Sequence, residues 1–392
     1  MPYTIGPGNK KLKRRKARAF KKLTKPIRKV WQNFSPLDAR GDRPLQMTFE
    51  DQLNALIYFH LEEYTSGRHL LQALEENDFA RDVIAPSEGI KKSSFFEAIN
   101  NRGLEQLAEI FQNLYAQAIT TLPKEYNDLG DLVSIDGSLI DAVLSMYWAD
   151  YREGSKKAKV HIGFDLNHSI TRSLPGSFSP TARRTSALLP VRSWLPDKQG
   201  LWTATTNAIK ISISGKQREN ILYAESKPVR RSNVPAPLKL SLTVLFFMTP
   251  SFYSAPPYVN QTEKEVRVVA YRVDQKNYWI ATNRHDLSAE QIATLYKLRW
   301  NIEVFFGWWK RHLKVYHLIA WSWYGLMVQI LAGLITYLLL AIYCHEQHHE
   351  KVSIKRIRQL RIQIQNEARA NDNMDFSQQA LNINQYSISA KT

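Results

Sequence analysis

The stretch from Tyr296 to Lys310, YKLRWNIEVFFGWWK, constrains the fold of this chain more than any other. Four polar residues recur along it: Tyr296, Arg299, Glu303 and Lys310. At roughly 100° per residue of an α-helix, these four side chains fall within about 60° of one another. Most residues between them are bulky and apolar, so we expect them to bury much of the remaining helix surface. The pattern predicts a helix with one polar face, on which a single carboxylate lies among cations.

The start of this helix can also be placed from the sequence. Ser288 is followed three residues later by Gln291, which is the spacing of a capping box, and no proline occurs from there to Trp321. A solvated polar stripe on an otherwise buried helix is the alternative interpretation of the four residues.

The spacing of the four residues resembles a family motif. Tyrosine, two residues, arginine, three residues, glutamate, six residues and lysine is the pattern of DDE transposases of the "insertion sequence four" family, and Tyr296 to Lys310 match it without a gap. The Arg299-Trp300 pair and the aromatic run after Glu303 are similar to that family as well. The resemblance implies an α/β fold: an RNase H-like catalytic core with an N-terminal all-helical domain and C-terminal helices.

A second acid stands upstream, in LVSIDGSLIDAV from Leu132 to Val143. Apolar and small residues run into Asp136, and an acid at the end of a strand is where an open sheet presents catalytic groups. The alternating segment Ala158 to Leu166 is expected to pair with this strand. Asp136 as a turn or N-cap residue before Leu139 is the structural alternative. We expect His161 and Asp165 on the second strand to be structural or to face substrate.

The resemblance assigns roles to these residues. It implies that Asp136 and Glu303 are catalytic acids and ligands of two Mg²⁺ ions, and that Tyr296, Arg299 and Lys310 contact the DNA of element ends. Cutting and joining DNA is phosphoryl transfer, in which two metal ions activate the nucleophile and stabilise the leaving oxygen. Cations can clamp neighbouring phosphates.

The middle of the chain does not fit this pattern. Between His168 and Tyr258 the sequence holds ten of the 17 prolines, thirteen serines and only three acids, and it predicts no convincing series of strands and helices. The family expects its second acid here as D-R-G-Y or D-R-Y-Y, and neither tetrapeptide occurs. Asp197 is a poor substitute, because Leu195-Pro196-Asp197-Lys198 has the composition of a turn.

A frameshift explains both anomalies. Trp202 is encoded only by TGG and Thr203 begins with AC, so a frame that starts on the last base of the tryptophan codon reads GAC, an aspartate codon. The next three codons, of Ala204 to Thr206, are then compatible with arginine, tyrosine and tyrosine. We hypothesise that residues 168–258 are an out-of-frame translation and that the second acid of the triad is lost near Trp202-Thr203.

Charge indicates the partner. The formal net charge is +17, which favours a polyanion, with an anionic membrane surface as the rival. Residues 1–37 contain no acid and form a basic arm, which we expect to be flexible and able to bind phosphates. A single cysteine, Cys344, excludes an intrachain disulfide and fits a reducing, cytoplasmic location. No secretory signal is recognised.

The remaining domains are predicted to be helical. Residues 38–122 are expected to form an N-terminal DNA-end-binding domain, with Ser93–Ala98 and Leu104–Ala118 as a candidate helix-turn-helix. Residues 123–350 form the transposase domain. Its uncharged segment Tyr324–Cys344 is interpreted as a buried core helix, with a membrane span as the alternative. Residues 351–392 are expected to form a basic helix followed by a disordered tail.

The sequence leads to two main hypotheses of function. The first is a transposase of a bacterial-type insertion sequence that catalyses metal-dependent DNA transposition. The second is a catalytically inactive DNA-binding remnant that lacks the second triad aspartate. A basic protein associated with membranes is a third, weaker alternative, and the resemblance also allows a homo-oligomer.

The frameshift hypothesis is tested on the gene. We expect its nucleotide sequence to contain, over residues 168–258, a second frame that encodes D-R-Y-Y or D-R-G-Y near Trp202. The same frame should align with close relatives once a single base is restored. An uninterrupted frame shared with those relatives over this stretch would contradict the hypothesis.

Overall fold

The structure is a computed structural model, and it describes residues 17–29, 37, 45–86, 88–142, 146, 149–152, 155–172, 208–211, 220–225, 245–248, 267–273, 276–282, 284–367 and 369. Helices and strands both occur, in two compact units. The helical unit draws on residues 1–122, 141–156 and 308–392, and the sheet unit on residues 123–140 and 157–307.

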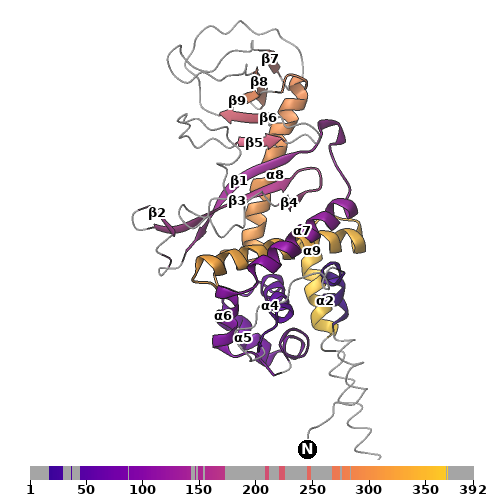
Figure 1. Ribbon diagram of the computed structural model, residues 1–392. Coiled ribbons are helices and arrows are strands. Elements are labelled where there is room, and N and C mark those ends of the chain that lie inside the picture. Colours follow the sequence, from indigo (N-terminus) through magenta and orange to yellow (C-terminus); the bar gives the residue numbers. More distant parts are fainter. Residues whose placement is uncertain are drawn as a thin grey trace, which may run out of the picture. The chain divides into compact units, whose positions relative to one another are not determined.

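The helical unit is built around one long apolar helix, α9, Trp323–His348 (Figure 1). Every residue from Gly325 to Cys344 is buried, and α4, α6 and α7 pack against it. The other helices of this unit are short or amphipathic, and each buries one face: α2 Arg18–Leu23, α3 Lys25–Arg28, α4 Phe49–Leu61, α5 Gly67–Glu76, a π-helical turn Ala80–Ile84, α6 Lys92–Asn101, α7 Leu104–Thr121 and a helix over residues 354–367.

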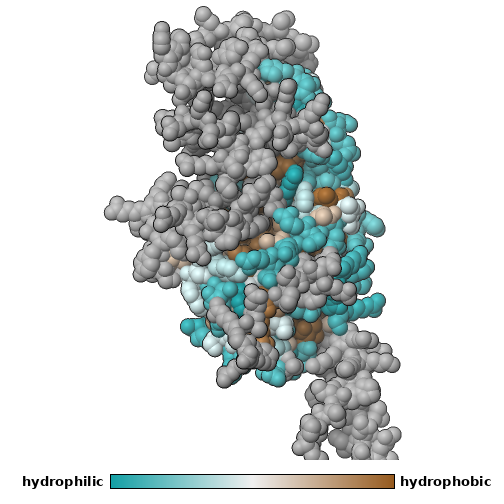
Figure 2. All heavy atoms as spheres, in the orientation of Figure 1, coloured by the Kyte–Doolittle hydropathy of each residue, from teal (hydrophilic) through white to brown (hydrophobic). Residues whose placement is uncertain are grey.

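The polar residues of α9 are satisfied inside the protein. Gln329 accepts from the backbone N–H of Ile319 at 2.8 Å and donates to the carbonyl of His317 at 2.7 Å, and the Thr336 hydroxyl donates to the Ala332 carbonyl at 2.7 Å. Among the described residues, α9 is the one helix long and apolar enough to cross a membrane, with a mean hydropathy of 2.2, yet it is enclosed by protein. On the face in Figure 2, apolar residues of the described part form small patches among hydrophilic ones. The structure therefore agrees with the core-helix interpretation.

Part of the basic arm is folded, which corrects the expectation of a flexible segment over residues 1–37. Residues 17–29 form α2 and α3, whose apolar side chains are buried; Phe20, for example, packs edge-on against Phe79 at 6.0 Å between ring centroids. The arm folds because apolar residues alternate with its cations at helical spacing and α9 offers a surface to cover them. Residues 1–16 lie outside the described part of the chain.

The sheet unit contains two sets of paired strands. In the first, β3 (Ser155–Asp165) lies between β1 (Val133–Asp141) and β2 (Asp150–Arg152), whose residues belong to the helical unit, and β4 (Ile170–Arg172) also pairs with β3. The second has the order β5-β6-β9-β8-β7, with antiparallel pairs throughout: β5 Ala208–Ile211, β6 Asn220–Glu225, β7 Leu245–Met248, β8 Arg267–Val273 and β9 Lys276–Thr282. Helix α8, Ala289–His312, follows β9.

Strands thus occur between His168 and Tyr258, where the sequence predicted no convincing series. β5, β6 and β7 pair through backbone groups with β8 and β9, whose own sequences are ordinary strand sequences. Because every residue except proline carries a backbone donor and acceptor, an existing sheet can accept a strand of unusual composition. The frameshift remains a hypothesis, and Asp197, Trp202 and Thr203 lie outside the described residues.

Helix α4 buries a histidine against the chain segment that follows α8. His60 is 0% exposed, and its Nδ1 lies 2.6 Å from the carbonyl oxygen of Leu313. Burial lowers the pKa of His60 to about 4, because the charged ring would lose its hydration. The neutral ring is therefore the form that the folded protein holds.

This burial makes stability depend on pH. Since the folded pKa lies below the ordinary value of about 6.5, the contribution of His60 is complete above about pH 6.5 and is lost as the pH falls toward 4. We expect His60→Gln to remove this part of the pH dependence, on the order of 3 kcal/mol in the free energy of unfolding. Denaturant titrations between about pH 7 and pH 4.5 measure it. His69→Gln, which changes an exposed histidine on α5, is the control, and equal pH slopes in both variants would contradict the prediction.

The N-terminus of α9 meets α6 at very close range. The Asn100 side-chain oxygen accepts from the N–H groups of Trp321 and Ser322, each at 3.1 Å. A Cβ added at Gly325 would lie 2.6 Å from this oxygen and 2.7 Å from Ala320 Cβ, closer than atoms can approach. Only glycine fits this contact without displacing it.

We expect Gly325→Ala to lower the free energy of unfolding by about 2 kcal/mol, because the added methyl group overpacks the contact. In an open helical position the same change would raise stability by up to about 1 kcal/mol through helix propensity. The sign of the change, measured by thermal or denaturant unfolding, therefore tests the contact. A more stable Gly325→Ala variant would show that the prediction is wrong.

Candidate active site

Helix α8 begins and runs as the sequence predicts. The Ser288 N–H donates to Gln291 Oε1 at 2.8 Å and the Gln291 N–H donates to Ser288 Oγ at 3.2 Å, which confirms the capping box. Tyr296, Arg299, Glu303 and Lys310 all lie on this one helix. Their exposure differs, however: Arg299 is buried, whereas the other three are half-buried.

Arg299 is the partner of the helix carboxylate. Its Nη1 donates to Glu303 Oε1 at 2.5 Å, one turn further along α8. Its guanidinium also lies 5.6 Å from the ring centre of Tyr296 and 5.9 Å from that of Trp300, distances at which a cation is attracted to an aromatic face. The side chain of Arg299 is 7% exposed and that of Glu303 is 28% exposed. The arginine therefore orients and neutralises Glu303 in this structure.

The apolar residues of α8 do not all face the interior, which corrects part of the expectation. Leu298, Ile302, Phe305 and Trp309 are buried, but Trp300 and Val304 are each 58% exposed. These two residues are four positions apart, so they form one exposed apolar strip beside the polar face. Only part of the circumference of α8 faces the interior of the protein. Arg299 lies on that part, whereas its neighbour Trp300 does not.

Asp136 lies within β1, and not at a strand end as the sequence suggested. The strand continues to Asp141, which also rules out the N-cap alternative, because Leu139 is a strand residue. β3 offers β1 a neighbouring strand, and Ile140 is buried, so the backbone has reason to stay extended. Asp136 is half-buried, and its Oδ1 accepts the N–H of Gly137 at 2.7 Å.

An aromatic contact joins α8 to the strands. Phe164 of β3 packs against Phe305 of α8 with ring centroids 5.2 Å apart. Since β1 is the neighbour of β3, the strand that carries Asp136 and the helix that carries Glu303 both border β3. The two predicted acids thus lie on elements of one unit that both contact β3.

Asn167 positions the start of β1, and the sequence analysis missed it. Its side-chain oxygen accepts from the Leu132 N–H at 2.6 Å, and its amide nitrogen donates to the carbonyls of Glu125 at 2.8 Å and Gly130 at 3.0 Å. Asn167 is 2% exposed. An asparagine in the turn after an alternating strand was the available signal, but only the fold shows which backbone groups it reaches.

Two arginines play a similar part before α8. Arg284 is 4% exposed and forms two contacts of 2.6 Å with the carboxylate of Asp286. Arg267 of β8 donates to the carbonyl of Leu287 at 2.5 Å. Together they fasten the connection between β9 and α8, and nothing in their spacing predicted this.

Asp165 is the last residue of β3, and its side chain has a structural role, which is one of the two roles expected for it. Its carboxylate accepts the His168 N–H at 3.0 Å, and its Oδ2 lies 3.1 Å from His168 Nδ1. These contacts close the turn between β3 and β4. His161 lies half-buried on β3.

A complete metal site is not formed by the described residues. Within that part of the chain, no group of three or more histidine, cysteine, aspartate or glutamate side chains could hold an ion. Glu303 has one oxygen engaged by Arg299, and Asp136 has one engaged by its own backbone neighbour. Asp136 and Glu303 supply hard oxygen donors of the kind Mg²⁺ takes, yet two carboxylates alone do not fit a site for two ions.

Comparison with known proteins identifies the region around α8. Residues 236–339, from before β7 into α9, match the family described as transposase DDE domain. The match begins at residue 236, inside the stretch hypothesised to be out of frame. No solved structure shows significant similarity to this chain.

Curated relatives match over similar lengths. The chain is 34% identical over 99 residues to the protein named "Probable transposase for insertion sequence element IS5377" of Geobacillus stearothermophilus, which covers 25% of this chain and 26% of that protein. It is 36% identical over 83 residues to a protein of Synechocystis named as a transposase for insertion sequence element IS4SA, over 19% of this chain and 25% of the relative. A protein of Sinorhizobium fredii named as a transposase is 37% identical over 76 residues, or 19% of this chain and 21% of that protein.

The chain therefore spans about a quarter of the length of the curated relatives it matches. In the segment that carries β7, β8, β9 and α8, it is similar to the transposase DDE domain family, and its relatives are named as transposases of insertion sequences.

Proposed function

We propose that this protein is a transposase of the "insertion sequence four" family, with an RNase H-like core, that binds the DNA of its element ends in the cytoplasm. The observation that carries the proposal is the match of residues 236–339 to the transposase DDE domain, because that segment contains the whole of α8 with its four polar residues. The net charge of +17 supports a nucleic acid partner.

The residues of α8 and β1 take the following roles in the proposal. Asp136 and Glu303 act as two acids of the catalytic site, where their carboxylates would bind Mg²⁺, the kind of metal ion that DDE transposases typically use. Tyr296 and Lys310 contact phosphates of the element end. Arg299 holds Glu303 at 2.5 Å and shares its charge with any phosphate that enters beside it.

A specific observation favours a second candidate, the catalytically inactive DNA-binding remnant. The sequence contains neither D-R-G-Y nor D-R-Y-Y, and the described residues form no cluster of three metal-binding side chains. Loss of one acid leaves the metal ions without a shared ligand, whereas the cations that bind DNA do not depend on that acid. Binding and cleavage are thus expected to separate in this protein.

The two candidates make different predictions for Glu303. We expect Glu303→Gln to abolish any magnesium-dependent cleavage of element-end DNA, because an amide is a poor ligand for Mg²⁺. DNA binding should be retained, since the variant loses only a negative charge. Cleavage is measured on end-labelled duplex, and binding by fluorescence anisotropy of the same duplex.

The matched control is Glu290→Gln, which removes an exposed carboxylate from the first turn of the same helix. A wild-type protein that binds element-end DNA without cutting it, unaffected by Glu303→Gln, supports the remnant. A protein that binds no DNA at all contradicts both candidates.

A further inference from the structure

The helix over residues 354–367 is attached to the helical unit by one face only. Ile357, Leu360 and Ile364 are buried at 2% exposure or less. On the same side, Arg361 donates to Glu63 at 2.8 Å, which fastens the helix to the residues after α4. The helix is therefore held firmly while its opposite face is left outside the core.

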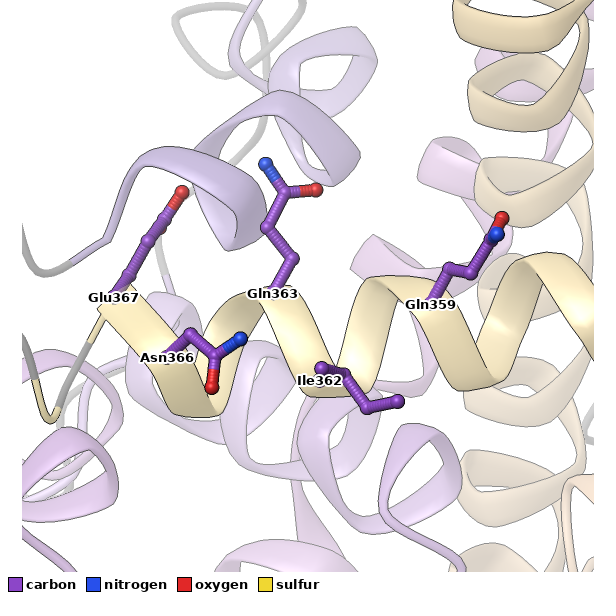
Figure 3. Close-up of a pocket in the computed structure, with 5 residues that line it drawn as sticks. All are labelled: Gln359, Ile362, Gln363, Asn366 and Glu367. Carbon is purple, nitrogen blue, oxygen red and sulfur yellow. The ribbon is translucent and has the colours of Figure 1, made fainter.

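The outward face of this helix has an unusual composition. Figure 3 shows a shallow surface hollow along it, with Gln359, Gln363 and Glu367 projecting in one row and Ile362 and Asn366 beside them. Ile362 is 54% exposed. Three side-chain amides thus surround one exposed branched apolar residue. The strip therefore offers hydrogen-bond donors and acceptors beside one exposed apolar side chain.

Cations flank this strip. Lys355, Arg358 and Arg369 are exposed on the same side of the helix, and no ion pair of Arg358 occurs within the described residues. The other two cations of the helix are paired: Arg356 with Glu350 at 2.6 Å and Arg361 with Glu63 at 2.8 Å. The outward face therefore carries exposed basic groups.

The folded part of the basic arm lies beside this helix and extends the positive surface. The Ala19 N–H donates to Glu367 Oε2 at 2.9 Å, which joins α2 to the end of the helix and engages its one carboxylate (Figure 1). The exposed residues of α2, α3 and the next position are all cations: Arg18, Lys22, Lys25, Arg28 and Lys29. This hydrogen bond thus joins two segments that are more than 300 residues apart in sequence and that both carry exposed cations.

A helix with this face is suited to the major groove of DNA. A glutamine or asparagine amide can donate to and accept from the edge of adenine at once, and an apolar side chain can contact the thymine methyl group. A helix with its side chains is roughly 10–12 Å wide, close to the width of the groove, about 12 Å. Flanking lysines and arginines contact phosphates and fix the orientation.

The candidate helix-turn-helix offers less for this purpose. Its second helix, α7, contains no lysine or arginine, and its exposed residues include Glu105 and Glu109. The apolar face of α7 is occupied by packing against α9. Phosphates would be repelled by the acidic side that remains exposed.

We infer that residues 354–367 form a DNA-reading helix, which places Gln359, Ile362, Gln363 and Asn366 in the major groove while α2 and α3 contact phosphates. The inference rests on the proposed function for its choice of DNA as partner, and it adds a second DNA surface outside Tyr296–Lys310. Its occupant is double-stranded DNA that contains A·T pairs at the positions read by the amides.

The test uses the full-length protein and a duplex library randomised over roughly 20 base pairs, about two helical turns. Selection with the wild-type protein should enrich a motif that contains A·T pairs. Specificity is the ratio of the affinity for the selected motif to the affinity for unselected duplex. Gln363→Ala and Asn366→Ala should each lower this ratio about tenfold. Arg358→Gln should weaken binding to all duplexes. It should also reduce the slope of log K against the logarithm of the salt concentration by about one.

Matched controls lie on α5 of the same unit: Gln72→Ala removes an exposed amide and Arg68→Gln removes an exposed cation. Both should bind the selected duplex like the wild type. Because all five positions are exposed or bonded only to a neighbour on the surface, thermal unfolding should show each variant folded.

Several outcomes overturn the inference. Equal affinity of Gln363→Ala and wild type for the selected motif would show that the helix reads no bases. If Gln363→Ala and Asn366→Ala lose self-association in sedimentation but bind DNA like the wild type, a second copy of the chain is the occupant of this face. Binding of vesicles with anionic lipid in place of duplex would identify a membrane surface. If the wild type binds duplex with an affinity that Lys310→Gln lowers and that the variants of residues 354–367 leave unchanged, the proposed function stands and this inference fails.

Discussion

The packing of the helical unit depends on α9, a helix that is apolar around its whole circumference. Such a helix cannot lie on a surface, because every side would expose hydrophobic area to water. It must be covered by other elements, and α4, α6, α7 and α2 cover it from distant parts of the sequence. Two polar side chains within its buried stretch, Gln329 and Thr336, bond to backbone carbonyls and N–H groups inside the protein. The need to enclose one helix therefore explains why N-terminal and C-terminal segments fold together.

The candidate active site depends on a different interaction, the pairing of Arg299 with Glu303. A carboxylate set among apolar residues is costly unless a cation or donor compensates for its lost hydration. Arg299 supplies that compensation at 2.5 Å, and its guanidinium lies 5.6 Å and 5.9 Å from the centres of two aromatic rings. The ion pair between Arg299 and Glu303 stabilises this face of α8, and it also reduces the negative charge that Glu303 can offer to a metal ion. Any partner that binds Glu303 must compete with the guanidinium.

The distribution of charge separates two possible tasks of the protein. One polar face, on α8, carries the residues that resemble a catalytic motif. The other, formed by α2, α3 and residues 354–367, has exposed cations around a strip of amides. The first depends on acids that must come together from several elements, and the second on a single docked helix. A change in the middle of the chain can therefore damage the first and leave the second intact.

How far the sequence alone could go is clear from particular residues. Periodicity placed α8, its capping box and the strands β3, β8 and β9, because local hydrogen bonding and hydrophobic spacing are properties of neighbouring residues. The spacing from Tyr296 to Lys310 determined the likeness to transposases. Tertiary structure decided that Arg299 is buried while Trp300 is exposed, that Asp136 lies inside a strand, and that Asn167 holds the start of that strand. It also brought residues 17–29 to the C-terminal helix. These features depend on contacts between residues far apart in the chain, and no local pattern contains that information.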